Sequence, residues 1–172
     1  MSDLSKEDIA TISQQVKEHI NATTPQKRKP NQSWEKRMVR EYVATMFPNN
    51  VPMFNLRVGP IQPTDIPGMT STLRRWVDVL VMVYPKFYLI EGKSRPEPGA
   101  VSQLTNYKML FPETPEFRDY AGKEIITRLV TMYEDRTVRK MCEAAGHEYE
   151  IFRPSFFRAY EQAKGIGVMV GQ

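Results

Sequence analysis

One stretch of the chain, residues 74–96, places charged residues inside segments that have the pattern of buried strands. Its sequence is RRWVDVLVMVYPKFYLIEGKSRP, in which Asp78, Glu91 and Lys93 stand among valine, leucine, isoleucine, methionine, tyrosine and phenylalanine. The two apolar runs predict two consecutive β-strands. A charged group removed from water without a partner costs several kcal/mol, so these three side chains must neutralise one another or bind something charged.

The geometry of the predicted hairpin decides whether the three charged side chains meet. Side chains alternate across a strand, so Glu91 and Lys93 share one face. We expect a four-residue loop, because the proline of Pro85-Lys86 cannot take the positive φ of a tight two-residue turn. That register places Asp78 opposite Lys93 and diagonal to Glu91, whereas a shift by one residue would turn Asp78 to the other face.

Two carboxylates close together repel each other, and Lys93 supplies only one compensating charge. A divalent cation would supply the rest, and two carboxylates with waters and a phosphate are a normal environment for Mg²⁺. The alternative is a structural ion pair of Lys93 with Asp78 or Glu91 at a sheet edge. The strands alone leave both interpretations open.

The remaining periodic segments predict one α/β domain. At 172 residues, the chain is long enough for a single domain with a sizeable core. The order of elements favours a central mixed β-sheet flanked by helices on both faces. The expected helices are 33–47, 100–111, 136–146 and 155–164, and the expected further strands are 51–59, 125–133 and 149–154. Residues 60–72 form a proline-rich loop that is a candidate substrate-facing segment.

The first 32 residues are predicted to form a separate segment: an amphipathic helix at 5–20, then a basic linker. Residues 33–172 form the domain itself. The helix could pack on the domain, on a second copy in a homodimer, or on a partner in a larger assembly. The polar N-terminus lacks a signal-peptide pattern, and no apolar run is long enough to cross a membrane. We therefore expect a cytoplasmic protein with no membrane partner.

The composition limits the chemistry. A net charge of +4 and local basic clusters allow a polyanionic partner without requiring one. One cysteine, Cys142, and two histidines exclude an internal disulfide and a Cys/His zinc cluster, so any metal must be held by oxygen ligands. We expect Cys142 in the core and both histidines, His19 and His147, at the surface.

Two neighbouring helices carry further polar residues toward the same region. Gln103 and Tyr107 are four residues apart on one helix, hence on one face, and Glu35 lies on the inward stripe of the helix at 33–47. With Asp78 and Glu91-Gly92-Lys93, this ordered set resembles the PD-(D/E)XK nuclease superfamily, in its RecB-like branch with Gln-x-x-x-Tyr. The resemblance covers residues 33 to about 153 and implies a restriction-endonuclease-like core. One departure is Val77, where a proline is frequent.

The resemblance implies metal-dependent hydrolysis of DNA phosphodiester bonds. Asp78, Glu91 and the carbonyl of Gly92 would hold Mg²⁺ or Mn²⁺, with Glu35 completing the metal shell. Lys93 would position the attacking water or stabilise the phosphate charge. The resemblance gives Gln103 and Tyr107 a role in contacting the substrate backbone or orienting the acids. The flanking arginines Arg74, Arg75 and Arg95 are candidate phosphate contacts.

Simpler interpretations of the same residues stay open. Glu35 could serve only the dipole of its helix, Gln103 and Tyr107 could be an ordinary helix face, and the arginines could be solvated strand ends. At the level of the whole protein, the alternative is a nuclease-fold component that binds DNA without cutting it, for instance in a phage particle or phage-infected cell. A third interpretation is an α/β adaptor whose strand charges are ion pairs.

Overall fold

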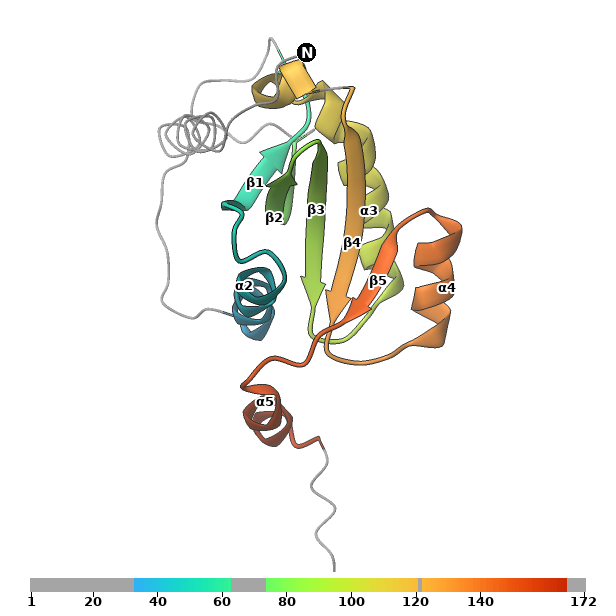
Figure 1. Cartoon of the computed structure of the whole chain (residues 1–172). Coiled ribbons are helices and arrows are strands. Elements are labelled where there is room, and N and C mark those ends of the chain that lie inside the picture. The colour runs from blue at the N-terminus through green and yellow to red at the C-terminus, as the bar shows by residue number, and fades with distance from the viewer. Residues whose placement is uncertain (1–32, 63–73, 121, 167–172) are drawn as a thin grey trace, which may run out of the picture.

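A five-stranded mixed sheet forms the centre of the computed structural model, which describes residues 33–62, 74–120 and 122–166 (Figure 1). The strands lie side by side in chain order, with β1/β2 and β2/β3 antiparallel and β3/β4 and β4/β5 parallel. This confirms the predicted α/β class. The strands are β1 (Pro52–Val58), β2 (Arg75–Val83), β3 (Lys86–Lys93), β4 (Glu124–Thr131) and β5 (Glu148–Ile151).

Helices cover both faces of the sheet, as the order of elements predicted. They are α2 (Trp34–Met46), α3 (Pro98–Leu110), α4 (Arg136–Ala144) and α5 (Phe157–Ala163), with two 3₁₀ helices, η1 (Phe111–Glu113) and η2 (Pro115–Tyr120), after α3. No helix in these described ranges is long and apolar enough to cross a membrane. The predicted helix at 5–20, its linker and residues 63–72 of the predicted loop lie outside the described residues.

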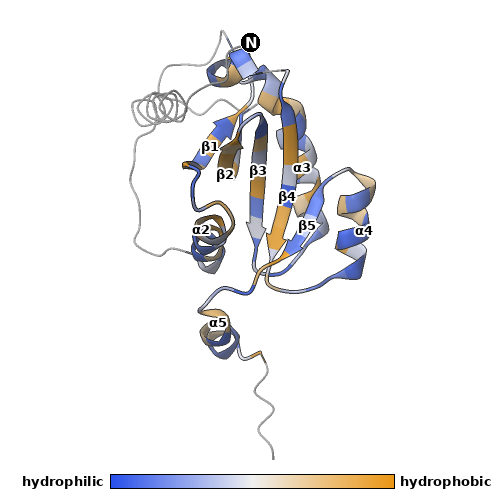
Figure 2. Ribbon diagram, in the orientation of Figure 1, coloured by the Kyte–Doolittle hydropathy of each residue, from blue (hydrophilic) through white to orange (hydrophobic). Residues whose placement is uncertain are grey.

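Two apolar clusters, one on each face, hold these layers together. The α3 side includes Leu80, Leu89 and Leu104, and the α2 side includes Val39 and Ile90; each of these side chains is at most 2 % exposed. The central strands carry long apolar stretches in Figure 2. Because adjacent residues of a strand point to opposite faces, a sheet buried on both faces needs nearly continuous apolar runs. The α3 side also includes Cys142, which confirms its expected place in the core.

Local capping explains where two of the helices begin. The Ser33 hydroxyl accepts a hydrogen bond from the backbone N–H of Lys36, as an N-cap does, so α2 starts where predicted. The last helix, expected to begin at Ser155 with that serine as its N-cap, begins later. The hydroxyl of Ser155 instead donates to the carboxylate of Glu41 on α2, at 2.9 Å, and α5 begins two residues later without a side-chain cap.

The β2–β3 hairpin has a tighter turn than predicted. Val83 pairs with Lys86, leaving Tyr84-Pro85 as a two-residue loop with a cis peptide bond. The expected four-residue loop is therefore wrong, and the register differs from the predicted one by two residues. A two-residue shift preserves the face of every side chain. The paired ladder ends at Val79 and Ile90, one residue before Asp78 is reached.

Strand β2 changes its side-chain alternation at Asp78. Val77 packs in the α3-side cluster and Val79 in the α2-side cluster, although residues two apart in a regular strand share a face. The neighbouring strand changes at the same level, where Asn55 has a left-handed φ of 53°. Asp78 thus occupies a local irregularity of the sheet and does not lie in a regular ladder.

His147 is buried, at 5 % exposure, which corrects its expected surface position. Its Nε2 lies 2.9 Å from Thr105 Oγ1 and its Nδ1 lies 2.7 Å from Thr127 Oγ1. Thr105 already donates its hydroxyl proton to the carbonyl of Val101, so Nε2 carries the imidazole proton and Nδ1 accepts from Thr127. This histidine joins α3 to β4, which is a structural role.

Candidate active site

Asp78 of strand β2 lies beside the carboxyl end of β3. The Asp78 Oδ2 atom accepts a hydrogen bond from the backbone N–H of Gly92 at 2.9 Å. A side chain of one strand thus bonds to the main chain of the next, close to the end of the paired ladder at Val79 and Ile90. This bond holds the carboxylate beside the Glu91-Gly92-Lys93 motif.

Glu91 is the central buried acid of the site, with 4 % exposure. Its Oε1 lies 3.2 Å from the Lys93 ammonium, and its Oε2 accepts a hydrogen bond of 2.9 Å from the hydroxyl of Tyr107 on α3. Each carboxylate oxygen therefore has one partner and keeps a further lone pair for another ligand.

Burial shapes the acidity of both carboxyl groups. Desolvation, followed by repulsion from Asp78, raises the pKa of Glu91 to about 7. Desolvation also raises the pKa of Asp78, against the hydrogen bond from Gly92 and the attraction of Lys93. The contribution of Asp78 to the pKa of Glu91 agrees with the place of the Asp78 carboxylate on the N–H of Gly92, the residue after Glu91. A cation beside them would favour ionisation of both.

Lys93 has carboxylate partners on two sides. It lies 3.2 Å from Glu91 and 3.4 Å from Glu97, and its side chain is 18 % exposed. Burial lowers the pKa of Lys93, but attraction by Glu91, Glu35 and Glu97 outweighs burial and the net shift is upward. The ammonium is thus charged at neutral pH. Sequence reasoning missed Glu97, although its four-residue spacing from Lys93 was a signal that could have found it.

The two residues of the Gln-x-x-x-Tyr motif differ in their hydrogen bonding. Tyr107 donates to Glu91, whereas Gln103, one helical turn earlier, has a buried Oε1 atom to which the described residues donate no hydrogen bond. A buried amide oxygen without a donor costs roughly 1–3 kcal/mol, so a ligand that supplies one would be favoured here.

Glu35 is held near the site by Ser94, the residue that follows β3. Its Oε1 accepts hydrogen bonds from the backbone N–H and hydroxyl of Ser94, at 3.1 and 3.2 Å. Its charge still acts on Asp78 and Lys93. No group of three or more His, Cys, Asp or Glu side chains within the described ranges is placed to hold a metal ion. Sequence reasoning missed Ser94, because nothing in the pattern distinguishes it.

The three arginines predicted to contact phosphate lie in different environments. Arg74 is 11 % exposed and forms an ion pair of 2.9 Å with Glu116, an environment that does not favour phosphate binding. Arg75 is exposed, and its charge acts on Tyr107. Arg95 is exposed, with its guanidinium 5.7 Å from the ring centroid of Tyr133.

Gly92 is a glycine because α2 packs directly on β3 at this point. A Cβ atom on Gly92 would lie 2.1 Å from Val39 Cγ2, closer than two carbon atoms can approach. Any larger residue would push α2 outward, together with Glu35, which α2 carries. The glycine of the motif therefore fixes the distance between the first helix and the acid-bearing strand.

The donor set fits a small, hard cation. Buried Glu91 and half-buried Asp78, both with raised pKa values, stand beside the main chain of Gly92, and the buried oxygen of Gln103 lacks a donor among the described residues. Oxygen ligands of this kind suit Mg²⁺ and Mn²⁺. Asp78 and Glu91 would hold the ion, with the Gly92 carbonyl as a third ligand.

Comparisons with known proteins give limited information. No family model and no curated protein matches the sequence. Among solved structures, "Structure of EndoMS-dsDNA2 complex" is similar at 18% sequence identity with a TM-score of 0.47, over 76% of this chain and 49% of that chain. The chain thus spans about half the length of that structure's chain. Membership in the PD-(D/E)XK superfamily stays a prediction from the motif residues.

Proposed function

We propose that this protein hydrolyses phosphodiester bonds of DNA with a divalent metal ion, Mg²⁺ or Mn²⁺, held by Asp78, Glu91 and the carbonyl of Gly92. The observation that supports this most is the convergence of two carboxylates, buried Glu91 and half-buried Asp78, and the Lys93 ammonium at the ends of adjacent strands. Such a group is costly for the fold and is compensated when a cation and a phosphate bind.

Each residue of the cluster has a distinct task in this proposal. The metal ion, when bound, would polarise the phosphate and lower the pKa of a bound water. Lys93 stabilises the negative charge that grows on the phosphate, as a compact ammonium can. Tyr107 fixes one oxygen of Glu91, and the N–H of Gly92 fixes one oxygen of Asp78, so both carboxylates are oriented before substrate arrives.

A non-cleaving DNA-binding protein with the same fold is the second candidate. It is favoured by the two carboxylate partners of Lys93, which neutralise the ammonium internally, and by the two hydrogen bonds that occupy Glu35 on Ser94. In that case the cluster is a structural ion-pair network.

A cleavage assay separates the candidates. Purified protein is incubated with linear, circular and branched DNA in Mg²⁺, Mn²⁺ or EDTA, and binding is measured in parallel. We expect metal-dependent cleavage that Asp78→Ala and Lys93→Ala abolish, while Glu143→Gln, an exposed change on α4, has no effect. Binding without cleavage in every metal would support the non-cleaving candidate. Absence of binding would refute both and leave the adaptor interpretation.

A further inference from the structure

Helix α2 presents a pair of cationic side chains next to Asp78. Lys36 and Arg40 are exposed and four residues apart, so they lie on one face of the helix. Both line a small pocket to which α2, β1 and β2 contribute. The residues lining it are Lys36, Val39, Arg40, Phe54, Asn55 and Asp78. This pocket adjoins the candidate active site through Asp78, which belongs to both.

The two cations are not used in holding the fold together. Over residues 33–62, 74–120 and 122–166, neither Lys36 nor Arg40 forms an ion pair, whereas Arg74, Arg128 and Arg139 each pair with a glutamate. The charge of Lys36 reaches Asp78 and favours its ionisation. The guanidinium of Arg40 lies 4.7 Å from the ring centroid of Phe54, a cation–π contact that positions it at the pocket wall.

Asn55 adds a neutral donor to the same pocket. Its φ of 53° is left-handed, a conformation that asparagine tolerates better than most residues. Asn55 stands at the point where β1 changes its alternation, opposite the irregularity at Asp78. A carboxamide, an ammonium and a guanidinium together are the donors that commonly contact DNA phosphates.

We propose that Lys36, Arg40 and Asn55 bind a DNA backbone phosphate that flanks the phosphate to be cleaved. This rests on the proposed function, because it assumes that the DNA strand to be cut runs along α2 and reaches the candidate active site at Asp78 and Glu91. Phosphate contacts position a strand without reading its sequence. The assignment therefore predicts binding that depends strongly on salt and only weakly on base sequence.

Binding to a short DNA duplex in EDTA tests the assignment without cleavage. The double variant Lys36→Ala/Arg40→Ala is compared with Arg136→Ala/Lys140→Ala, which removes the same two charges at the same spacing from the exposed face of α4. We expect the α2 variant to weaken binding about tenfold or more and to reduce the magnitude of the slope of log K against log salt by about 1, since the pair contacts one phosphate and each lost phosphate contact reduces it by about 1. The α4 variant should keep at least half of the affinity.

Asn55→Gly gives a second variant that keeps the left-handed backbone accessible and removes only the carboxamide. We expect it to weaken binding severalfold with an unchanged salt slope. Equal losses from the α2 and α4 variants, or an unchanged slope for the α2 variant, would overturn the assignment even if the wild-type protein cuts DNA. Wild-type protein that binds DNA by way of α2 but never cuts would instead refute the proposed hydrolysis and support the phosphate site.

Discussion

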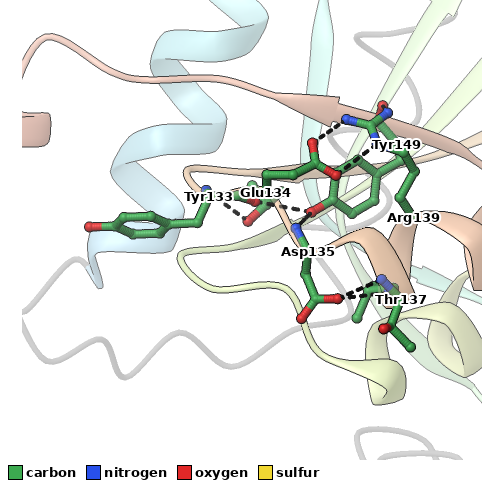
Figure 3. A network of polar contacts seen from close by, with 8 residues as sticks. Tyr133, Glu134, Asp135, Thr137, Arg139 and Tyr149 are labelled. Atoms are coloured by element: carbon green, nitrogen blue, oxygen red, sulfur yellow. Dashed lines mark hydrogen bonds and ion pairs between the residues drawn. The ribbon is translucent and has the colours of Figure 1, made fainter.

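Two polar clusters stand at the carboxyl ends of neighbouring parallel strands, and they are built differently. The candidate site follows β3, and the β4–α4 turn follows β4, beside it in the sheet. In the turn, Asp135 accepts from the backbone N–H groups of Thr137 and Val138, at 2.9 and 3.0 Å, while Glu134 pairs with Arg139 at 2.6 Å (Figure 3). Every one of these groups has a complementary partner.

The glutamates of the two clusters also have pKa values shifted in opposite directions. A hydrogen bond from Arg139 lowers the pKa of Glu134, as expected for a satisfied carboxylate at the surface. In the candidate site, burial and a neighbouring acid raise the pKa of Glu91 to about 7. The turn uses its charges to begin a helix, whereas the candidate site holds a carboxylate whose ionisation is disfavoured by burial and by a neighbouring acid. This difference is the physical argument for function at the end of β3.

The largest difference should appear when the cation of each cluster is removed. We expect Lys93→Ala to lower the cleavage rate about 10³-fold, because a preorganised charge at a developing anion contributes roughly that much. Arg139→Ala, the matched change in the turn, should leave the rate within a factor of two. Single-turnover cleavage with saturating protein measures both. If both variants lost a similar part of the cleavage rate, the losses would reflect a general loss of stability and not a role of Lys93 in the reaction.

The second prediction concerns stability without metal. The pKa of Glu91 is about 7 in the fold against 4.5 when unperturbed, so the fold holds this proton more tightly than the unfolded chain does. Its contribution to stability is full below about pH 4.5 and is lost as the pH rises through 7. We expect Glu91→Gln to stabilise the protein in EDTA at pH 8 by on the order of 3 kcal/mol at most, and by little at pH 4.5.

Urea unfolding at the two pH values, with Glu134→Gln as the matched variant, checks that prediction. The turn variant should show no such gain, because the pKa of Glu134 is shifted in the opposite direction. A Glu91→Gln protein that is less stable than the wild type at pH 8 would contradict the account of a strained carboxylate.

Tyr107→Phe should have a smaller effect on the same carboxylate. The hydrogen bond from Tyr107 lowers the pKa of Glu91, so its loss should raise that pKa further. We expect roughly a tenfold lower rate at neutral pH, a factor that corresponds to about one pKa unit. The pH–rate profile should shift to higher pH, and raising the pH should recover part of the loss. A uniform loss at every pH would show that Tyr107 acts otherwise.

The smallest effect is expected in the turn. Asp135→Ala removes the N-cap of α4 and should cost about 1 kcal/mol of stability, the usual value for a cap. The cleavage rate should not change at temperatures where the variant is folded. Thermal unfolding measures the loss of stability. If Asp135→Ala lowered the cleavage rate as much as Lys93→Ala does, the two clusters would not differ in function.

The layout of the sheet was predictable because it depends on local pattern. Apolar periodicity located the five strands and the four α-helices, while the two 3₁₀ helices η1 and η2 fall in a segment expected to be a loop. Asp78 lies beside Gly92 as expected, although the alternation of β2 changes at Asp78. The error in register lies at the turn, where Tyr84-Pro85 forms a two-residue loop in place of the expected four-residue loop.

What the sequence did not indicate depends on distant partners. Arg74 was predicted to meet phosphate, but it pairs with Glu116, 42 residues away. His147 was expected at the surface, but it is buried between hydroxyls of α3 and β4. Neither partner has a periodic relation to its residue, so no local pattern could reveal it. The pocket at Lys36 and Asn55 likewise forms only when α2 packs on the sheet.

Calorimetric titration with Mn²⁺ at pH 8 tests most directly whether Asp78 and Glu91 form a metal site. We expect saturable binding to the wild-type protein, at least a tenfold loss of affinity in Asp78→Asn, and no loss in Glu134→Gln, the control from the neighbouring cluster. Wild-type protein without saturable binding, or equal affinities for all three proteins, would contradict the account.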